Sequence, residues 1–389
     1  MTTTEANHPE PPSTKKLTAP TKFRVTYTYV KNPDREIDSS LNELAATEGL
    51  VVSNFTIASV VETNRESLCI HYTQAHDQLV AGYTDGVVRV YKSNTMELTQ
   101  ALTDEDIVET PAPVTNIKHR PTSKNYPITD TILCTYANGC VKCWNYNFCQ
   151  CLYTIKEKRQ TYGIAYHPRL PKFVTCGDDC KIYLYDEENR IQERIFAGSN
   201  TPGVLDGHTS RVFTACFNPR SNHELITGGW DNVVQFWDAR QPFAIRYIPG
   251  VHVCGDGLDI HPKGTEILTC AWQKDKPLQL WDYGSGKLIS TIEPDVYTAK
   301  LYCGKFINKD YFVCGGTEPN VFRLLDAKNY HPVGSINKLP GAVYSIAIGP
   351  FKKRQPETKK SKASARPDLT LNIPRLAIVS GKKIYQLEF

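Results

Sequence analysis

The chain has 389 residues, 13 of them Cys, and its 45 Lys and Arg against 41 Asp and Glu leave a net charge of +4. This near-neutral balance gives no sign of a polyanion-binding protein, and a composition of 40% hydrophobic and 22% charged residues excludes wholesale disorder. The chain has 21 Tyr, 14 Phe and 5 Trp but only 2 Met, together with 24 Gly and 25 Pro. Aromatic residues favour strands and frequent turn formers favour many short elements, so a strand-rich fold is expected.

Residues 1–50 are predicted to be an N-terminal extension. Residues 1–22 are rich in Thr, Pro and Lys and lack the apolar core of a signal peptide, so we expect them to be largely disordered. Residues 23–30 are a strand candidate. Residues 37–48 fit a short helix with a capping box at 40–43, which would either dock on the domain or contact a partner.

The compartment follows from the absence of a signal peptide and of any run of about 18 apolar residues, the length that a membrane span needs. We therefore expect no membrane association and a cytoplasmic or nuclear location. Disulfides are rare in those compartments, so the cysteines should be thiols.

Two cysteine pairs have short spacings of the kind found in metal sites. Cys140 and Cys143 form a C-x-x-C sequence, and Cys149 and Cys151 follow closely. Residues 140–144 read as a strand, in which side chains three positions apart point to opposite faces. No second pair follows at metal-site spacing, so we interpret these residues as small core side chains and predict neither a metal nor a cofactor.

From residue 51 onward the sequence is dominated by a repeat, which is clearest between residues 207 and 238. It begins with Gly-His, continues with a strand that ends before Pro219 and a strand that ends in Thr-Gly, and closes with a turn at Asp231 and a strand ending in Trp-Asp. The six-residue step from the turn Asp or Asn to the last aromatic recurs in four further units. These pairs are Asp85 and Tyr91, Asn138 and Trp144, Asp179 and Tyr185, and Asp275 and Trp281.

A sixth unit ends at Leu325 in place of the aromatic, and a seventh begins near residue 342. The six strand-ending positions are separated by 53, 41, 52, 44 and 44 residues, which indicates one four-stranded unit per interval with insertions in two of them. The seventh unit has only three strand candidates, at 342–348, 375–379 and 383–389.

The Gly-His and Trp-Asp pattern resembles the WD-repeat (WD40) β-propeller family. The resemblance covers about residues 51–389 and implies an all-β fold, a seven-bladed β-propeller of four-stranded antiparallel blades. An open ring would leave an exposed sheet edge. We therefore predict that residues 51–61 complete the C-terminal blade beside 383–389, with 23–30 as the alternative.

The resemblance also implies a hydrogen-bonded structural tetrad in the fourth unit, formed by His208, Thr227, Asp231 and Trp237. A His, Thr and Asp set also occurs in hydrolases, but the matched blade positions favour a structural network. The sequence contains no G-x-S-x-G elbow, phosphate-binding loop or H-E-x-x-H motif.

Carboxylates that converge on the central channel would be the sign of a propeller enzyme. Asp256 and Asp259 lie in a predicted innermost strand, but two residues from one blade are too few for a catalytic centre. We predict no catalytic residue and no small-molecule substrate.

Partner binding is implied on the face formed by the loops that lead into each blade and by the turns between second and third strands. Two alignment positions should reach this face: the second residue of each innermost strand, and the residue before each turn Asp or Asn, such as Trp230 or Lys274. The candidate channel-mouth residues are Tyr162, Arg211, Phe213, Trp230, Tyr302 and Tyr344. Aromatic and Arg side chains are enriched at binding hot spots, although each aromatic could instead plug the channel or pack between blades.

The seventh unit carries a long insertion, residues 351–374, between its first and second strands. Its basic residues are Lys352, Lys353, Arg354, Lys359, Lys360, Lys362 and Arg366. The segment 352–366 fits a flexible loop, a nuclear-import patch or a polyanion contact, and it lacks aromatic residues for base stacking. It should leave the domain on the face opposite the channel mouth.

These features predict a non-enzymatic scaffold that binds partner proteins or peptides at the channel mouth and assembles them into a multisubunit complex. The first alternative is a nuclear, chromatin- or RNA-associated propeller that uses the basic loop. A propeller enzyme is the second alternative.

Overall fold

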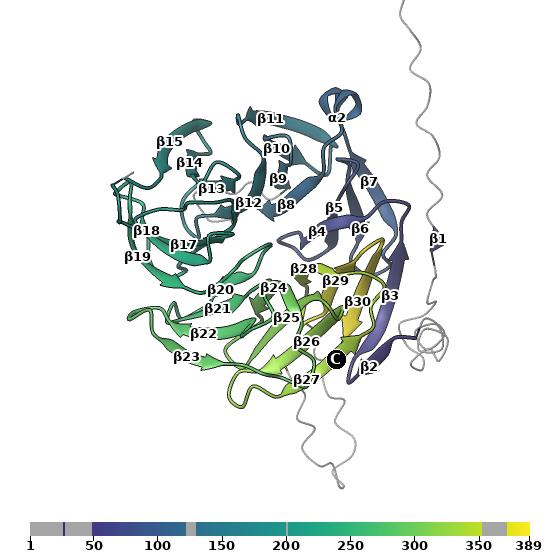
Figure 1. Cartoon of the computed structure of the whole chain (residues 1–389). Helices are drawn as coiled ribbons and strands as arrows, with labels where there is room; N and C mark the ends of the chain where they lie inside the picture. The colour runs from purple at the N-terminus through teal and green to yellow at the C-terminus, as the bar shows by residue number, and fades with distance from the viewer. Residues whose placement is uncertain (1–25, 28–48, 122–129, 200, 352–371) are drawn as a thin grey trace, which may run out of the picture.

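The computed structural model describes residues 26–27, 49–121, 130–199, 201–351 and 372–389. Seven antiparallel sheets stand around a central axis, each with its first strand innermost (Figure 1). The predicted all-β, seven-bladed architecture is thereby confirmed. The helix expected at 37–48 and the basic segment 352–366 lie outside the described residues.

The first three blades follow the repeat units in chain order. They are β4(Ser67–Tyr72), β5(Gln78–Tyr83), β6(Val88–Lys92) and β7(Leu98–Leu102); β8(Val114–His119), β9(Thr131–Tyr136), β10(Cys140–Asn145) and β11(Gln150–Lys156); and β12(Thr161–Tyr166), β13(Lys172–Gly177), β14(Ile182–Asp186) and β15(Ile191–Phe196).

Blades four to six continue the same order. They are β16(Val212–Phe217), β17(Glu224–Gly229), β18(Val233–Asp238) and β19(Ala244–Pro249); β20(Leu258–Ile260), β21(Glu266–Cys270), β22(Leu278–Asp282) and β23(Leu288–Thr291); and β24(Lys300–Phe306), β25(Tyr311–Thr317), β26(Val321–Asp326) and β27(Pro332–Asn337). The seventh blade begins with β28(Val343–Ile348), β29(Leu376–Ser380) and β30(Lys383–Glu388).

The ring is closed by the N-terminal strand β3(Thr56–Glu62), which pairs antiparallel with β30. The prediction that residues 51–61 complete the last blade is therefore confirmed, with one difference. Asn54, with φ of 58°, breaks the segment, and β2(Val51–Ser53) pairs with β27 of the sixth blade instead. The alternative strand lies at the edge, since β1(Thr26–Tyr27) pairs with the outer side of β3.

The second and third strands of the blades form the core, because each blade packs between two neighbours. Every residue of β9 and β18 is buried, and the two largest fully buried side chains are Trp144 and Trp237. Such strands lack the alternation of a one-sided sheet, as expected for strands covered on both faces. The strands of the predicted C-x-x-C segment belong to this core, with Cys140 and Cys143 both buried in β10.

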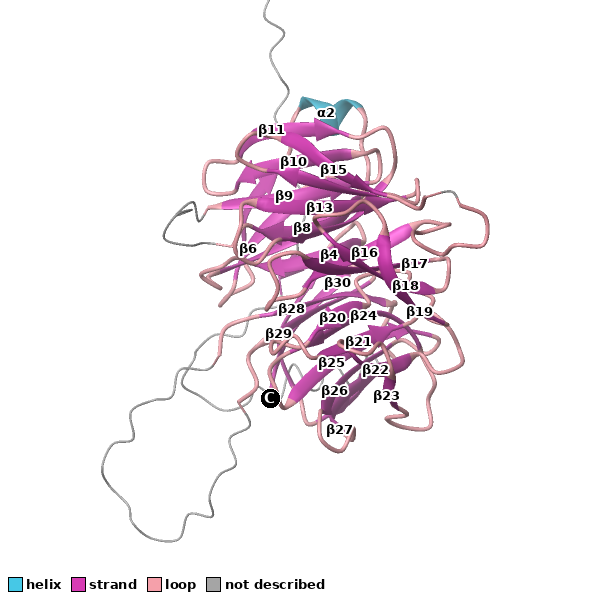
Figure 2. Cartoon of the chain, turned by 90° about the vertical axis from the view of Figure 1, so that its left-hand side faces the viewer, coloured by secondary structure: helices cyan, strands magenta, loops and turns pink. Residues whose placement is uncertain are grey.

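The insertions fall in the connections between blades or between strands. The short helix α2(Glu105–Glu109), capped by Asp104, lies in the loop that leads into the second blade. Sequence analysis did not predict this helix, although it placed an insertion in that interval. Figure 2 shows the blades from the side, with α2 at one edge of the ring.

Candidate partner-binding site

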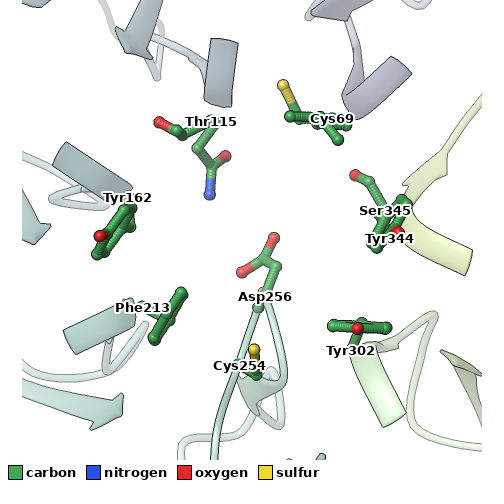
Figure 3. Close-up of a pocket in the computed structure, with 12 residues that line it drawn as sticks. Cys69, Thr115, Tyr162, Phe213, Cys254, Asp256, Tyr302, Tyr344 and Ser345 are labelled. Atoms are coloured by element: carbon green, nitrogen blue, oxygen red, sulfur yellow. The ribbon is translucent and has the colours of Figure 1, made fainter. Parts of the chain in front are cut away.

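A cavity of about 210 Å³ opens at the mouth of the central channel. Figure 3 shows side chains from several blades directed toward it. It is lined by Leu68, Cys69, Thr115, Asn116, Tyr162, Phe213, Cys254, Gly255, Asp256, Tyr302, Tyr344 and Ser345. Four of the six predicted mouth residues, the three tyrosines and Phe213, therefore share one cavity.

The aromatic side chains extend beyond the cavity as a continuous arc of rings across blades three to seven. Successive ring centroids lie 4.8, 5.4, 6.1, 6.2, 6.2 and 5.0 Å apart. In order, the rings are Tyr162, Phe213, Trp230, His252, Trp272, Tyr302 and Tyr344. We call these seven residues the aromatic arc.

Trp230 is placed at the rim by a close approach of two backbones. A Cβ atom on Gly229 would lie 2.1 Å from the carbonyl oxygen of Arg211, so only glycine fits there. The amide of Trp230 then donates to the same carbonyl oxygen at 2.9 Å. The Arg211 guanidinium lies 5.1 Å from the Trp230 ring centroid, and the Trp230 residue is 38% exposed. Trp230 is thus a member of the arc, and Arg211 contacts the arc through the Trp230 ring.

His252 and Trp272 belong to the arc but were missed by sequence analysis. The six-residue step made Lys274 the counterpart of Trp230, and this assignment is wrong. The turn between β21 and β22 is longer, so Trp272 takes the position of Trp230, and its amide donates to the His252 carbonyl oxygen at 2.7 Å. The resemblance of Thr-Cys-Ala-Trp at 269–272 to Thr-Gly-Gly-Trp at 227–230 was the signal that could have found it.

A second cation lies against the arc at Trp272. The Lys300 ammonium is 4.6 Å from the Trp272 ring centroid and 2.6 Å from a Glu318 carboxylate oxygen. The arc therefore carries one cation that is ion-paired, Lys300, and a more exposed one, Arg211.

The floor of the mouth cavity is a partly buried ion-pair cluster that sequence analysis did not predict. Asp256 precedes β20 rather than lying in it, which corrects the expected placement. Its Oδ2 atom lies 3.0 Å from Lys118 Nζ and 3.3 Å from Lys305 Nζ, and Thr214 Oγ1 donates to its Oδ1 atom at 3.2 Å. Burial alone would raise the pKa of Asp256, but the two ammonium groups outweigh burial and hold that pKa well below its usual range.

Asp256 also lines a second cavity, of about 280 Å³, toward the far ends of the innermost strands. The rings of His71 and His119 lie 4.9 Å apart there, and burial lowers the pKa of both imidazoles. Burial raises the pKa of Asp259 in the same cavity to about 6. The Asp259 Oδ2 atom accepts a hydrogen bond from the Phe306 amide at 2.7 Å, which fixes the carboxyl group in place.

The predicted tetrad lies inside the fourth blade and away from the mouth cavity. His208 Nδ1 is 2.7 Å from Asp231 Oδ2, and His208 Nε2 is 2.6 Å from Thr227 Oγ1. Trp237 Nε1 donates to the same Thr227 oxygen at 2.7 Å. The structure thus brings the four side chains together in one hydrogen-bonded chain, and their stabilising role stays a prediction.

The third blade replaces the histidine with a buried ion pair. Arg159 donates to Thr175 Oγ1 and to Asp179 Oδ1, both at 2.7 Å. Glu157, 2.7 Å from Arg159 Nε, accepts from the Tyr185 hydroxyl at 2.8 Å. The network between the lead-in loop and the third strand is thus kept with different side chains.

Within the described ranges, no three His, Cys, Asp or Glu side chains are grouped so as to hold a metal ion. None of the helices described for this chain has the length and apolar character to cross a bilayer.

Comparisons with known proteins give a match to one family model and matches to individual relatives. The model of the "WD domain, G-beta repeat" matches residues 149–186 and 199–238. A striatin homolog from Dictyostelium discoideum is 27% identical over 213 residues, 51% of this chain and 25% of that protein. Nuclear distribution protein nudF 1 from Talaromyces marneffei is 26% identical over 157 residues, 40% of this chain and 32% of that protein.

The ribosome biogenesis protein WDR12 homolog from Anopheles gambiae is 22% identical over 217 residues, 54% of this chain and 46% of that protein. The matched regions thus span between a quarter and a half of the length of these relatives. Together with the seven blades and the Gly-His and Trp-Asp repeat, these matches show that the chain contains WD repeats and folds as a β-propeller.

Proposed function

We propose that this protein is a non-enzymatic scaffold that binds partner proteins or peptides at the channel mouth and assembles them into a complex. The observation that carries the proposal is the aromatic arc, in which seven rings from five consecutive blades follow one another at centroid distances of 4.8 to 6.2 Å. Aromatic and Arg side chains dominate the binding energy of protein interfaces.

The arc differs from an ordinary core cluster in its exposure. Trp230 is 38% exposed, and Tyr162, Phe213, Tyr302 and Tyr344 are only partly buried although they surround a cavity. The large aromatics of the core, such as Trp144 and Trp237, are 0% and 1% exposed. Partly exposed rings that line a cavity retain apolar surface that a partner would remove from water.

The chemistry of the channel supports binding rather than catalysis. The Asp256 carboxylate at the cavity floor accepts from two ammonium groups and a hydroxyl, so it has little capacity left to act as a base or a nucleophile. The His208, Thr227 and Asp231 set is likewise engaged in the Trp237 network.

A second surface would lie on the face opposite the mouth. Residue 351 follows the far end of β28, and the Asn372 carbonyl oxygen accepts from Asn308 Nδ2 at 3.1 Å, so the ends of the insertion are anchored away from Tyr344. We propose that the basic residues of 352–366 serve this surface, as an import signal or a polyanion contact. A cytoplasmic or nuclear location accords with such a role.

The test is quantitative affinity purification of the full-length protein from native cells, with wild-type chain, Trp230→Ala and Tyr302→Ala compared by mass spectrometry. Phe148→Ala is the matched control, because Phe148 is an aromatic residue 77% exposed outside the arc. We expect both mouth variants to lose a shared subset of partners at least tenfold, while Phe148→Ala retains them. Retention of every partner by both mouth variants would refute the proposal.

A further inference from the structure

One exposed cation of the aromatic arc, Arg211, has no ion-pair partner among the described residues. Lys274 and Lys276 are also exposed, but they line a separate cavity of about 240 Å³ together with Glu293 and Asp295. Arg211 is therefore the cation that stays available at the mouth.

The cavity floor has the same sign. Lys118 and Lys305 both lie against the single carboxylate of Asp256, so the groups that meet at this point sum to one positive charge. Asp259 offsets this charge when it is ionised, but it lines the far cavity and not the mouth. A cationic side chain entering the mouth would therefore find no free carboxylate at the floor.

The other acidic groups of this face are ion-paired or lie at the two ends of the arc. Glu318 pairs with Lys300, whereas Asp178 lies near Tyr162 and keeps its charge while it accepts from the Gln160 amide at 3.0 Å. Glu66 is exposed on the side of Tyr344, and burial followed by the Glu66 charge raises the pKa of that tyrosine. Arg211, which has no ion-pair partner in the described part of the chain, thus lies between carboxylates at the two ends of the arc.

The ring geometry favours a peptide over a single-stranded nucleic acid. Nucleic acids bind aromatic platforms by stacking bases on open ring faces. Here Tyr162 and Phe213 stack on each other at an interplanar angle of 5°, and a face of Trp230 is occupied by Arg211. The surface offers ring edges, a small cavity and separate cations, which suit apolar and acidic side chains at different positions.

We propose that the partner enters the mouth as an extended acidic peptide segment that carries one large apolar or aromatic side chain. This side chain occupies the cavity formed by Tyr162, Phe213, Tyr302 and Tyr344, while a neighbouring carboxylate pairs with Arg211. The assignment rests on the proposed function of the mouth and adds the chemistry of its partner. Arg offers a carboxylate two parallel donors, which makes Arg211 the principal contact.

The experiment is selection of a random dodecapeptide display library on the full-length protein, followed by fluorescence anisotropy with the most enriched peptide. We expect the selected pool to be more acidic than the starting library and to contain a large apolar residue. Arg211→Glu and Trp230→Ala should each weaken binding of the selected peptide at least tenfold. Lys287→Glu is the charge-reversal control, since Lys287 is exposed in the fifth blade on the connection opposite the mouth.

Reversing the charge of both the peptide and residue 211 separates a lost contact from a misfolded variant, because a misfolded variant would bind neither peptide. The selected peptide with its acidic residues replaced by Lys should bind Arg211→Glu more tightly than it binds the wild-type protein. A neutral or basic selected pool, no enrichment over the library, or tighter Trp230-dependent binding of oligouridine would each overturn the inference.

The two proposals fail in different ways. Peptides that require Trp230 but are indifferent to the charge at Arg211 would leave the mouth as a binding site and remove the acidic assignment. Retention of all cellular partners by Trp230→Ala would instead remove the proposed function.

Discussion

Trp230 and Trp272 occupy equivalent positions in adjacent blades, each held by a hydrogen bond from its amide to the carbonyl oxygen of a residue that precedes the innermost strand of the same blade. The acceptors are Arg211 at 2.9 Å and His252 at 2.7 Å. The His252 ring lies between the two indoles, 6.1 Å from one and 6.2 Å from the other. Two adjacent blades thus place a pair of indoles on one rim.

This equivalence predicts that Trp272→Ala reproduces the binding defect of Trp230→Ala. Trp272 contacts both His252 and Tyr302, so its removal interrupts the arc and should weaken partner or peptide binding at least tenfold. The loss of stability should stay near 1–2 kcal/mol, because the side chain is only partly buried. Anisotropy and thermal unfolding of the same preparation check both values, and unchanged affinity would contradict the equivalence.

The tetrad predicts a large stability effect without direct loss of a mouth contact. Asp231→Ala removes the acceptor of both His208 Nδ1 and the exposed Thr209 amide, and it leaves the buried His208 imidazole without one of its two partners. We expect the free energy of unfolding to fall by about 2–4 kcal/mol. Asp275→Ala, an exposed turn residue of the next blade, is the control and should change it by less than about 0.5 kcal/mol. Equal unfolding midpoints for the two variants would exclude the network as a stabilising element.

The channel cluster predicts an ordering of two substitutions. Asp256→Asn removes the carboxylate that the ammonium groups of Lys118 and Lys305 share and leaves them close together with only Asp259 nearby, which should cost about 3 kcal/mol of unfolding free energy. Lys118→Met should cost less, because Asp256 keeps Lys305 and the Thr214 hydroxyl. Urea unfolding at pH 7 measures both, and a larger loss for Lys118→Met would contradict the shared role of Asp256.

Asp259 predicts a pH dependence of stability. Burial raises its pKa to about 6, whereas the unfolded chain should have a value of about 4. The folded protein therefore holds a proton that the unfolded chain has already released, and the contribution of Asp259 to stability falls as the pH rises from about 4 to about 6.

Asp259→Asn removes the carboxyl group that binds this proton, so the variant lacks this pH-dependent contribution to stability. Its free energy of unfolding relative to wild type should therefore rise by roughly 1–3 kcal/mol between pH 4 and pH 6.5. Parallel stability curves for the two proteins over this interval would show that the carboxyl group does not titrate there. Both proteins retain His71 and His119, so the contribution of these residues to the pH dependence cancels in the difference between the two curves.

The blades could be predicted from sequence because their signals are local. The turn at Asp231 and the strand ending at Trp237 lie within one blade and repeat at a nearly constant interval. The closing strand could be predicted because the last unit has only three strand candidates of its own. Its break at Asn54 could not be foreseen, because residues 51–53 pair with β27 only after the ring brings the sixth and seventh blades together.

The site was harder to predict because its residues meet only in the closed ring. Phe213 and Tyr302 occupy the same position in the repeat, near the start of an innermost strand. Their convergence on the mouth could therefore be predicted from the repeat alignment. Trp272 was missed because a longer turn displaced it from the six-residue step. Lys118, Lys305 and Asp256 come from three different blades, and no spacing along the chain links them.

The pairing of β3 with β30 has a consequence for the order of synthesis. Its partners, such as Val60 and Tyr385, are more than 300 residues apart in the sequence. During translation, β3 emerges early and waits with an unpaired edge until β30 has left the ribosome. The ring therefore closes only after β30 has been synthesised, so a chain truncated before β30 cannot form the seventh sheet and exposes the edge of β3 to aggregation.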